Sequence, residues 1–264
     1  MATGSYTAES ITVLEGLEAV RRRPGMYIGG VDKTGFHHLL WEIVDNSIDE
    51  VMNGHASKIV VTLHSDGKTM SVSDNGRGIP VDAHSKTGLS ALEVIFTTLH
   101  AGGKFDNDSY KVAGGLHGVG ASVVNALSKS LVAEVRRDGL LHTQRFRRGK
   151  PLGPVETGDP VRGSGTTITF TPDNEIFRDQ NFDADLIAER LEVKTFLNKG
   201  LTIQFVNEKA KETREFRHDG GVADFLEAVN KARDDVRVAS IPFVLERSDD
   251  DLQVSLALTW TEAT

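Results

Sequence analysis

Apolar positions recur along the chain with the period of a helix in some segments and of a strand in others. The longest helical pattern covers residues 36–53, where one face is apolar. That face consists of Leu40, Ile43, Val44, Ile48 and Val51. A weaker amphipathic pattern covers residues 8–22 and ends in a basic turn at 21–25. Further helices are predicted over 90–99, 119–127, 183–200 and 222–233, from apolar spacing and from the cap signals Ser90, Asp183 and Gly200.

Strand patterns come mostly in pairs that are joined by tight turns, which predicts antiparallel hairpins. The predicted strands are 57–64 with 69–74, 131–137 with 140–146, 166–170, 201–206, and finally 236–246 with 252–260. Helices and hairpins mix without strict strand–helix–strand alternation. We therefore expect an α+β fold, a two-layer sandwich with helices on one face of a mixed, mainly antiparallel sheet.

Composition excludes several classes of protein and of site. The 264 residues contain no cysteine, so disulfides, zinc–thiolate sites and cysteine nucleophiles are excluded. With 30 Lys and Arg against 38 Asp and Glu, the net charge is −8, which argues against nucleic-acid binding as the main role. No apolar run is long enough for a membrane span, and the first residues do not resemble a secretory signal. We expect a cytoplasmic location.

The helix predicted at 36–53 is the first place where chemistry is expected. Between residues 39 and 54 it carries no Lys or Arg, and it holds four acids, Glu42, Asp45, Asp49 and Glu50, together with Asn46. Glu42, Asn46 and Asp49 fall within about 60° of each other around the helix axis. One interpretation is a solvated polar face. The other is a site for an oxygen-liking cation such as Mg²⁺, with a carboxylate as general base for a water molecule.

Two glycine-rich segments are the other candidates. Residues 74–80 place Asp74 at a strand end before Gly76 and Gly78, which allow close approach to a ligand, although a plain turn has the same composition. Residues 114–122 contain clustered glycines before a helix, which is typical of an anion site but also of a flexible loop. A Walker A motif is excluded because Thr62 stands at its first glycine position, and a Rossmann fingerprint because Val123 stands at its third.

Taken in order, these three segments resemble the GHKL (Bergerat-fold) ATPases. The family includes type II topoisomerases, a heat-shock chaperone family, MutL proteins and sensor histidine kinases. Residues 23–29, 42–50, 100–105 and 114–120 resemble more narrowly the ATPase subunits of bacterial type II topoisomerases, and the similarity runs from about Tyr6 to Trp260. The sequence does not distinguish between the two branches of that group, gyrase and topoisomerase IV. Other GHKL proteins are a more distant alternative.

The resemblance implies a role for particular residues. Glu42 corresponds to the general base, Asn46 to the Mg²⁺ ligand, and Asp49 and Glu50 to acidic neighbours, with Glu50 paired to Arg77. Asp74 corresponds to the acid that reads adenine, assisted by Thr166 and a water molecule. The base pocket would be lined by Gly78, Ile79, Pro80 and Ile95. The lid and phosphate contacts would come from Lys104, Tyr110, Gly115, Leu116, His117, Gly118, Val119, Gly120 and Ala121. Tyr6 would reach the partner subunit's nucleotide site, and Arg137 would lie at the pocket mouth where aminocoumarin inhibitors bind.

The resemblance also implies a domain organisation and a set of partners. Residues 1–220 would form the GHKL ATP-binding domain, with an arm at 1–20 and an ATP lid at about 98–120. Residues 221–264 would begin a transducer domain that is incomplete, because no Gln-Thr-Lys follows residue 221. The cofactors would be ATP and Mg²⁺. The partners would be a second copy of the subunit, the A subunit of gyrase in an A2B2 complex, and DNA through other domains. ATP-driven dimer closure would then power DNA supercoiling. The alternative for this chain is a nucleotide-binding switch with little hydrolysis.

Overall fold

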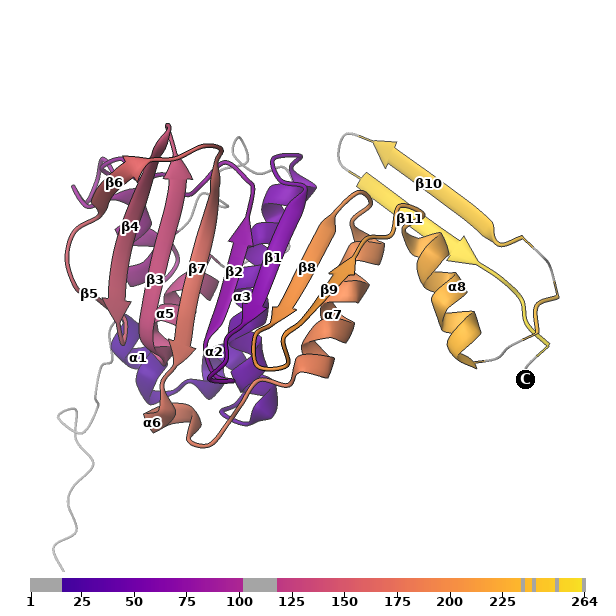
Figure 1. Ribbon diagram of the computed structural model, residues 1–264, viewed down its shortest axis with the longest axis horizontal. Coiled ribbons are helices and arrows are strands. Elements are labelled where there is room, and N and C mark those ends of the chain that lie inside the picture. Colours follow the sequence, from indigo (N-terminus) through magenta and orange to yellow (C-terminus); the bar gives the residue numbers. More distant parts are fainter. Residues whose placement is uncertain (1–15, 102–117, 234–235, 239–240, 250–251, 263–264) are drawn as a thin grey trace, which may run out of the picture.

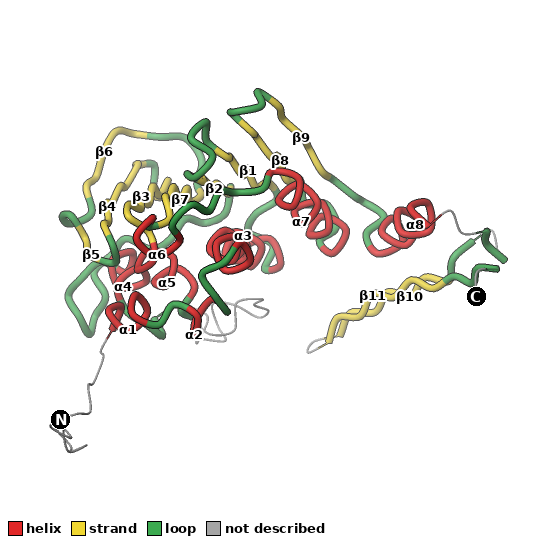
Figure 2. Tube along the Cα trace, turned by 90° about the horizontal axis from the view of Figure 1, so that it is seen from below, coloured by secondary structure: helices red, strands yellow, loops and turns green. Residues whose placement is uncertain are grey.

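The fold is a two-layer sandwich, with a twisted sheet on one side and helices packed on the other (Figures 1 and 2). The computed structural model describes residues 16–101, 118–233, 236–238, 241–249 and 252–262. Among these residues the main sheet has nine strands, in the order β5-β4-β3-β7-β2-β1-β8-β9 with β6 paired to β4. Its strands are β1 (Lys58–Leu63), β2 (Met70–Asp74), β3 (Ser128–Arg137), β4 (Leu140–Arg147), β5 (Lys150–Pro151), β6 (Glu156–Pro160), β7 (Gly165–Pro172), β8 (Thr202–Asn207) and β9 (Glu212–Phe216).

The helices of this layer follow from the same sequence patterns. They are α1 (Gly16–Arg22), α2 (Gly25–Ile28), α3 (Lys33–Met52), α4 (Ala91–Thr97), α5 (Gly120–Leu127), α6 (Asn174–Phe177) and α7 (Ala184–Leu197). The predicted caps at α4 and α7 are confirmed, because Ser90 accepts a hydrogen bond from the Glu93 N–H, and Asp183 from the Asp185 and Leu186 N–H groups. Gly200 has φ of 79°, as a left-handed helix stop requires.

The sheet is mixed, as predicted. β1 and β8 run parallel, while the other pairs described within the main sheet are antiparallel. The hydrophobic core lies between the sheet and the helices. Its largest fully buried side chains include Phe96, Phe146, Phe170 and Phe177. The core therefore fixes α3, α4 and α5 on one face of the central strands.

Helix α3 differs from its prediction in two ways. It begins at Lys33, three residues before the predicted start, because Asp32 caps it by accepting a hydrogen bond from the Gly35 N–H at 3.0 Å. It is also buried over more than one face, and the Asp49 side chain has no exposed surface. The solvated polar face considered for this helix is therefore wrong for Asp49.

Several short elements escaped the sequence analysis. The basic turn predicted at 21–25 overlaps the end of α1 and the start of the short helix α2, which was not expected. α6, β5, β6 and β9 also had no expected counterpart. β6 and β9 are edge strands with mostly exposed residues, so they lack the alternation of buried and exposed side chains on which strand prediction rests. The part of the amphipathic pattern at 8–15 lies outside the described residues.

The C-terminal segment packs beside α7 and ends in a separate hairpin. α8 (Val222–Arg233) follows the turn at 218–221, and β10 (Phe243–Asp249) pairs antiparallel with β11 (Leu252–Leu258). β10 begins seven residues later than its predicted start at 236. In place of that strand start, Arg237 forms an isolated bridge with Thr261. Within the described part of the chain, no helix combines the length and apolarity that crossing a membrane would require.

Candidate functional site

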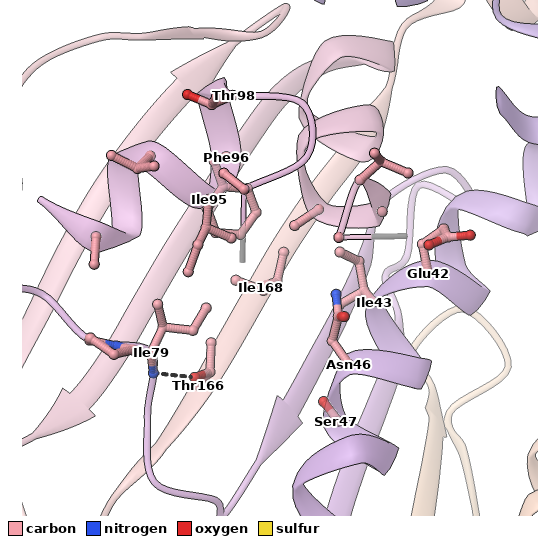
Figure 3. Close-up of a pocket in the computed structure, with 18 of the residues that line it drawn as sticks. Glu42, Ile43, Asn46, Ser47, Ile79, Ile95, Phe96, Thr98, Thr166 and Ile168 are labelled. Atoms are coloured by element: carbon pink, nitrogen blue, oxygen red, sulfur yellow. Dashed lines mark hydrogen bonds between the residues drawn. The ribbon is translucent and has the colours of Figure 1, made fainter. Parts of the chain in front are cut away.

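A cavity of about 1070 Å³ opens between α3, α4, the start of α5 and the loop that follows β2. Figure 3 shows Ile43, Asn46 and Ser47 on one side of it and Ile79, Ile95 and Thr166 on the other. Many residues singled out from the sequence line this cavity. They are Glu42, Asn46, Glu50, Asp74, Arg77, Gly78, Ile79, Pro80, Ile95, Gly118, Val119, Gly120, Ala121, Arg137 and Thr166. The three sequence segments that seemed separate thus meet at one site.

Asp74 is the buried acid of the cavity. It ends β2 with 7% of its surface exposed. One carboxylate oxygen accepts hydrogen bonds from the Gly76 N–H at 2.9 Å and the Thr166 N–H at 3.2 Å, and the other accepts from the Ser47 hydroxyl at 3.1 Å. Burial raises the pKa of Asp74 above its ordinary value, and these hydrogen bonds oppose the rise only in part. A carboxylate fixed in this way can accept a further hydrogen bond from a ligand amine.

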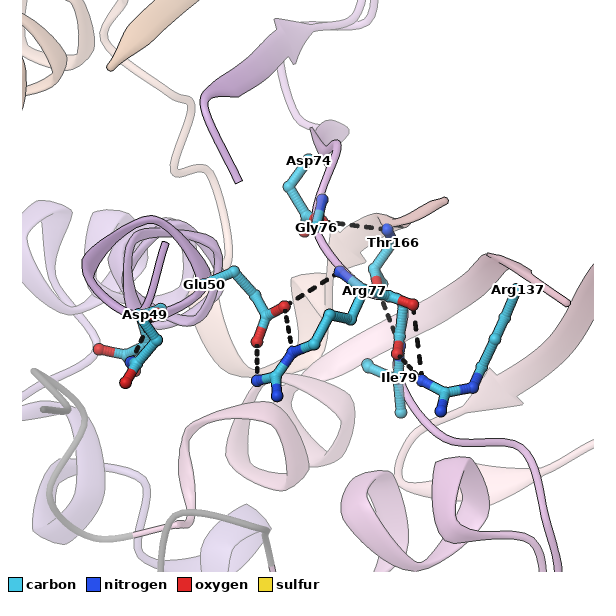
Figure 4. Close-up of polar contacts among 10 residues, drawn as sticks. Asp49, Glu50, Asp74, Gly76, Arg77, Ile79, Arg137 and Thr166 are labelled. Carbon is cyan, nitrogen blue, oxygen red and sulfur yellow. Dashed lines mark hydrogen bonds and ion pairs between the residues drawn. The ribbon is translucent and has the colours of Figure 1, made fainter. Parts of the chain in front are cut away.

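The loop after β2 is held by an ion pair that the resemblance to the GHKL ATPases implied. Arg77 reaches Glu50 of α3 through Nη2 at 2.8 Å and Nε at 3.1 Å, and the Arg77 N–H also donates to Glu50 at 3.1 Å (Figure 4). Gly78 in the same loop has φ of 76°, and a Cβ there would lie 2.9 Å from the Arg136 carbonyl oxygen. Both the conformation and the contact require glycine.

Arg137 and Thr166 complete this wall of the cavity. Arg137 Nη1 donates to the Gly78 carbonyl at 2.8 Å, and the Ile79 N–H donates to the Thr166 hydroxyl at 3.2 Å. The apolar faces of Ile79 and Ile95 are partly buried against the core. The result is an apolar slot whose deep end holds Asp74.

Glu42 stands at the opposite side of the cavity. Its carboxylate lies 2.9 Å from His38 Nε2, one turn earlier on α3. This hydrogen bond is the main reason why the pKa of His38 is raised, against the opposing effect of desolvation. Gly120, the first residue of α5, packs so closely that a Cβ there would lie 2.1 Å from Glu42 Oε2. The backbone at the start of α5 and the Glu42 carboxylate therefore face the same space.

The start of α5 has the features of an anion site. Its first N–H groups have no partner within the helix, and the helix dipole is positive at this end. Gly118, with φ of 59°, and Val119 precede it and line the cavity. A ligand with an amine at Asp74 and an anionic group near α5 would therefore match both ends of the cavity.

Not every expected residue can be placed. Tyr6, Lys104, Tyr110, Gly115, Leu116 and His117 lie outside the described residues. Asp49 is described, but it is buried within the fold and is not among the residues that line the cavity. Figure 4 shows it on α3, on the side away from the Arg77 guanidinium.

Sequence reasoning also missed residues of the site. His38 could have been found, because it lies four residues before Glu42 on a predicted helix, and such pairs meet. Ser47 follows Asn46 directly, but its bond to Asp74 spans 27 residues and leaves no local signal. Other lining residues that were not assigned to the site are Tyr27, Ile43, Val72, His84, Lys86, Thr87, Ala91, Val94, Phe96 and Ile168. Asp45, which also lines the cavity, belongs to the predicted acidic helix, and Thr98, His100 and Ala101 fall within the lid expected at about 98–120.

Comparison with known proteins gives consistent results. The profile of the "Histidine kinase-, DNA gyrase B-, and HSP90-like ATPase" family matches residues 31–176. DNA gyrase B of Thermotoga maritima is 48% identical over 263 residues, which is 98% of this chain and 41% of that protein. DNA gyrase B of Haloferax volcanii is 53% identical over 232 residues, 86% of this chain and 36% of that protein. This chain thus spans about two-fifths of the length of these relatives.

A solved structure shows the same fold. The 43K ATPase domain of Thermus thermophilus gyrase B, in complex with an aminocoumarin, superposes with a TM-score of 0.83 at 40% sequence identity. The match covers 94% of this chain and 63% of that chain. The similarity therefore extends over nearly the whole of this chain.

Proposed function

The chain belongs to the histidine kinase-, DNA gyrase B- and HSP90-like ATPase family, and from this premise we propose that it binds and hydrolyses ATP as the ATPase region of a DNA gyrase B protein. The observation that carries the proposal is one cavity with two different ends. A buried carboxylate, Asp74, ends the apolar slot, and the Glu42 carboxylate faces the start of α5. The relatives described above favour the gyrase branch over topoisomerase IV.

The base of the nucleotide would lie in the apolar slot. Adenine carries an exocyclic amine, which can donate to the carboxylate oxygen of Asp74 that Ser47 also contacts. Ile79 and Ile95 would pack on the ring, and Arg137 fixes the loop at the mouth through the Gly78 carbonyl. The Asp74 interaction selects for a donor at that position, because a carbonyl oxygen there would place an acceptor against the carboxylate oxygen, with no hydrogen between them.

The phosphates would lie toward α5 and Glu42. The N–H groups of Gly120 and Ala121 at the start of α5 suit negative charge. Glu42 would accept a proton from the attacking water as general base, and His38 would hold its carboxylate in place through the 2.9 Å contact. Phosphoryl transfer depends mostly on positioning and electrostatics. The main contribution of Glu42 on α3 and of the N–H groups of α5 to the reaction would therefore be their fixed separation.

The donor set near Glu42 fits Mg²⁺ bound together with a nucleotide. The described residues contain no cluster of three side chains of the kind that holds a metal by protein ligands alone. Mg²⁺ in nucleotide sites takes one or two protein oxygens, and phosphates and water complete its coordination. Asn46 lines the cavity one turn after Glu42 and would supply the amide oxygen. When bound, the ion would neutralise phosphate charge.

The proposal extends to a longer protein of the same kind as the relatives, of which this chain would be one region. Residues 1–220 would form the ATP-binding domain, and 221–264 would begin a transducer domain. The longer protein would close as a dimer on binding ATP. In the cytoplasm it would act with the A subunit of gyrase and with DNA to drive supercoiling. It would also bind aminocoumarin inhibitors at the ATP site. The aminocoumarin complex of the Thermus thermophilus domain supports the last point.

Calorimetric titration of the variant Asp74→Asn with a non-hydrolysable ATP analogue and Mg²⁺ tests the proposal. The amide keeps the shape and can still accept from the Gly76 and Thr166 N–H groups, but it loses the carboxylate that receives the amine. A charged hydrogen bond of about 1.5–3 kcal/mol corresponds to a roughly 10- to 150-fold weaker affinity. The control is Asp66→Asn, the same change in the exposed turn between β1 and β2. An unchanged affinity in Asp74→Asn would refute the proposed site.

A further inference from the structure

Two acidic residues of α3, Asp45 and Glu50, obtain their positive partners from other parts of the fold. Residues 39–54 contain no Lys or Arg. Glu50 is paired with Arg77 from the loop after β2, at 2.8 Å. Asp45 is paired with Lys194 of α7, whose Nζ lies 2.5 Å from the Asp45 carboxylate. The cation at Asp45 is thus supplied by a helix 149 residues further along the chain.

Side chains link helix α7 to α3 at three levels, and both helices lie on the same face of the sheet (Figures 1 and 2). At the start of α3, Lys33 Nζ lies 2.6 Å from Asp183, the N-cap residue of α7. Further along, the guanidinium of Arg190 lies 5.2 Å from the centre of the Trp41 ring. Lys194 follows Arg190 by one turn and meets Asp45. The two helices are therefore joined by two lysine–aspartate pairs. In the first the lysine, Lys33, is on α3. In the second, beside the cavity, the lysine, Lys194, is on α7.

The position of Asp45 makes its charge important. Asp45 lines the cavity together with Glu42, its neighbour one turn earlier, and with Asn46. Two carboxylates on this wall repel a polyphosphate. The Asp45 side chain is 41% exposed and that of Lys194 is 24% exposed, so the pair is partly shielded from water and its field reaches the cavity. Lys194 itself is not among the lining residues and acts through Asp45.

We propose that Lys194 is a positioning residue for the phosphate part of the ligand: it orients and neutralises Asp45, and thereby allows a polyphosphate to enter the cavity beside α3. The inference rests on the proposed function and adds to it a determinant of ligand charge. Without the ammonium group, Asp45 would present its full negative charge to the phosphates, while the slot for the base would be unaffected. The effect should therefore depend on how many phosphates the ligand carries.

The experiment compares adenosine, ADP and a non-hydrolysable ATP analogue on wild type and on Lys194→Met, at low and at high salt. We expect affinity for the ATP analogue to fall by about fivefold at low ionic strength, affinity for ADP to fall less, and affinity for adenosine to stay unchanged. The difference should shrink at high salt, because screening weakens the repulsion. Lys194→Arg keeps the charge and should restore affinity for the ATP analogue.

The matched control is Lys33→Met, which removes the other lysine–aspartate pair between the same two helices. It should leave all three affinities unchanged. Thermal melting of each variant checks that the fold is retained. Equal losses for adenosine and the ATP analogue, equal effects of Lys33→Met and Lys194→Met, or no loss at all would overturn the inference while the proposed function stands. If the wild type binds no nucleotide, both fail together.

Discussion

Gly120 lets the backbone of α5 approach the Glu42 carboxylate, and the variant Gly120→Ala should separate catalysis from folding. The added methyl carbon would lie 2.1 Å from Glu42 Oε2, 3.1 Å from its Cδ and 3.3 Å from its Cβ. Glu42 is a flexible side chain that is 31% exposed, so it can move away without disturbing the core. Its departure would weaken the 2.9 Å contact with His38 and move the proposed general base away from its place.

The size of the effect follows from these distances. Side-chain carbons do not approach other atoms closer than 3.0 Å, so the carboxylate oxygen must move by about 1 Å. A misplacement of about 1 Å at a reacting group can cost about 100-fold in rate, and loss of a general base costs about 10²–10⁴-fold. We therefore expect kcat for ATP hydrolysis to fall by about 100-fold. Alanine favours a helix more than glycine by up to about 1 kcal/mol, so stability should not fall.

Steady-state ATP hydrolysis, calorimetric titration with a non-hydrolysable analogue and thermal melting would be measured on the same preparations. Gly153→Ala is the control, because a Cβ there meets nothing within 4 Å. In the double variant with Glu42→Asp, the shorter acid should leave room for the methyl group, so the two effects should not add. An unchanged kcat in Gly120→Ala would refute the placement of Glu42 as the general base.

Two further predictions follow from charged pairs. Glu42→Gln should lower the pKa of His38 toward its ordinary 6.5, as followed by NMR titration, because the Glu42 hydrogen bond is the main cause of the raised pKa. A His38 pKa that does not move would contradict the pairing. In the wild type this contact stabilises the fold fully below pH 6.5 and less as pH rises through the raised pKa. Asp173→Asn should lower the free energy of unfolding in urea by about 3 kcal/mol, because Asp173 is fully buried and lies 2.8 Å from the Arg21 guanidinium. Burial alone would raise the pKa of Asp173, but its hydrogen bonds and neighbouring arginines lower it, so this contribution is present above pH 3.8 and is lost as pH falls through the lowered pKa. The exposed Asp179→Asn should change little, and equal losses in the two variants would count against the buried pair.

Those parts of the fold that depend on local signals could be predicted from the sequence. Ser90 and Asp183 begin helices because their side chains accept from nearby N–H groups, and this chemistry needs only three residues of context. The hairpin of β3 and β4 follows from alternation and from a two-residue turn at 138–139, both of which are local. Edge strands such as β9 were missed because their side chains are mostly exposed and carry no pattern.

The order of the strands lay beyond this reasoning. β7 lies between β3 and β2 in the sheet, and its register with β3 pairs Thr166 with Val135. That arrangement brings the Thr166 N–H to Asp74, 92 residues earlier in the chain. Nothing in the residues around Thr166 specifies such a contact. The resemblance to known ATPases implied that Thr166 assists Asp74. The strand order explains this physically, because β7 lies beside β2 and places the Thr166 N–H against Asp74.

The acidic helix shows why a charge pattern must be interpreted together with its tertiary partners. The sequence offered a solvated face or a metal site, and both treat the carboxylates of α3 as one group. In the fold each acid has a different environment: Glu42 meets His38 on its own helix, Glu50 meets Arg77 from a loop, and Asp45 meets Lys194 from α7. Because these partners are 4, 27 and 149 residues away, only the first could be found from helical spacing. Glu50 holds a loop through Arg77, and Asp45 is paired with Lys194. The Glu42 carboxylate, beside the start of α5, is therefore the acid of this helix that we propose for work on a phosphate.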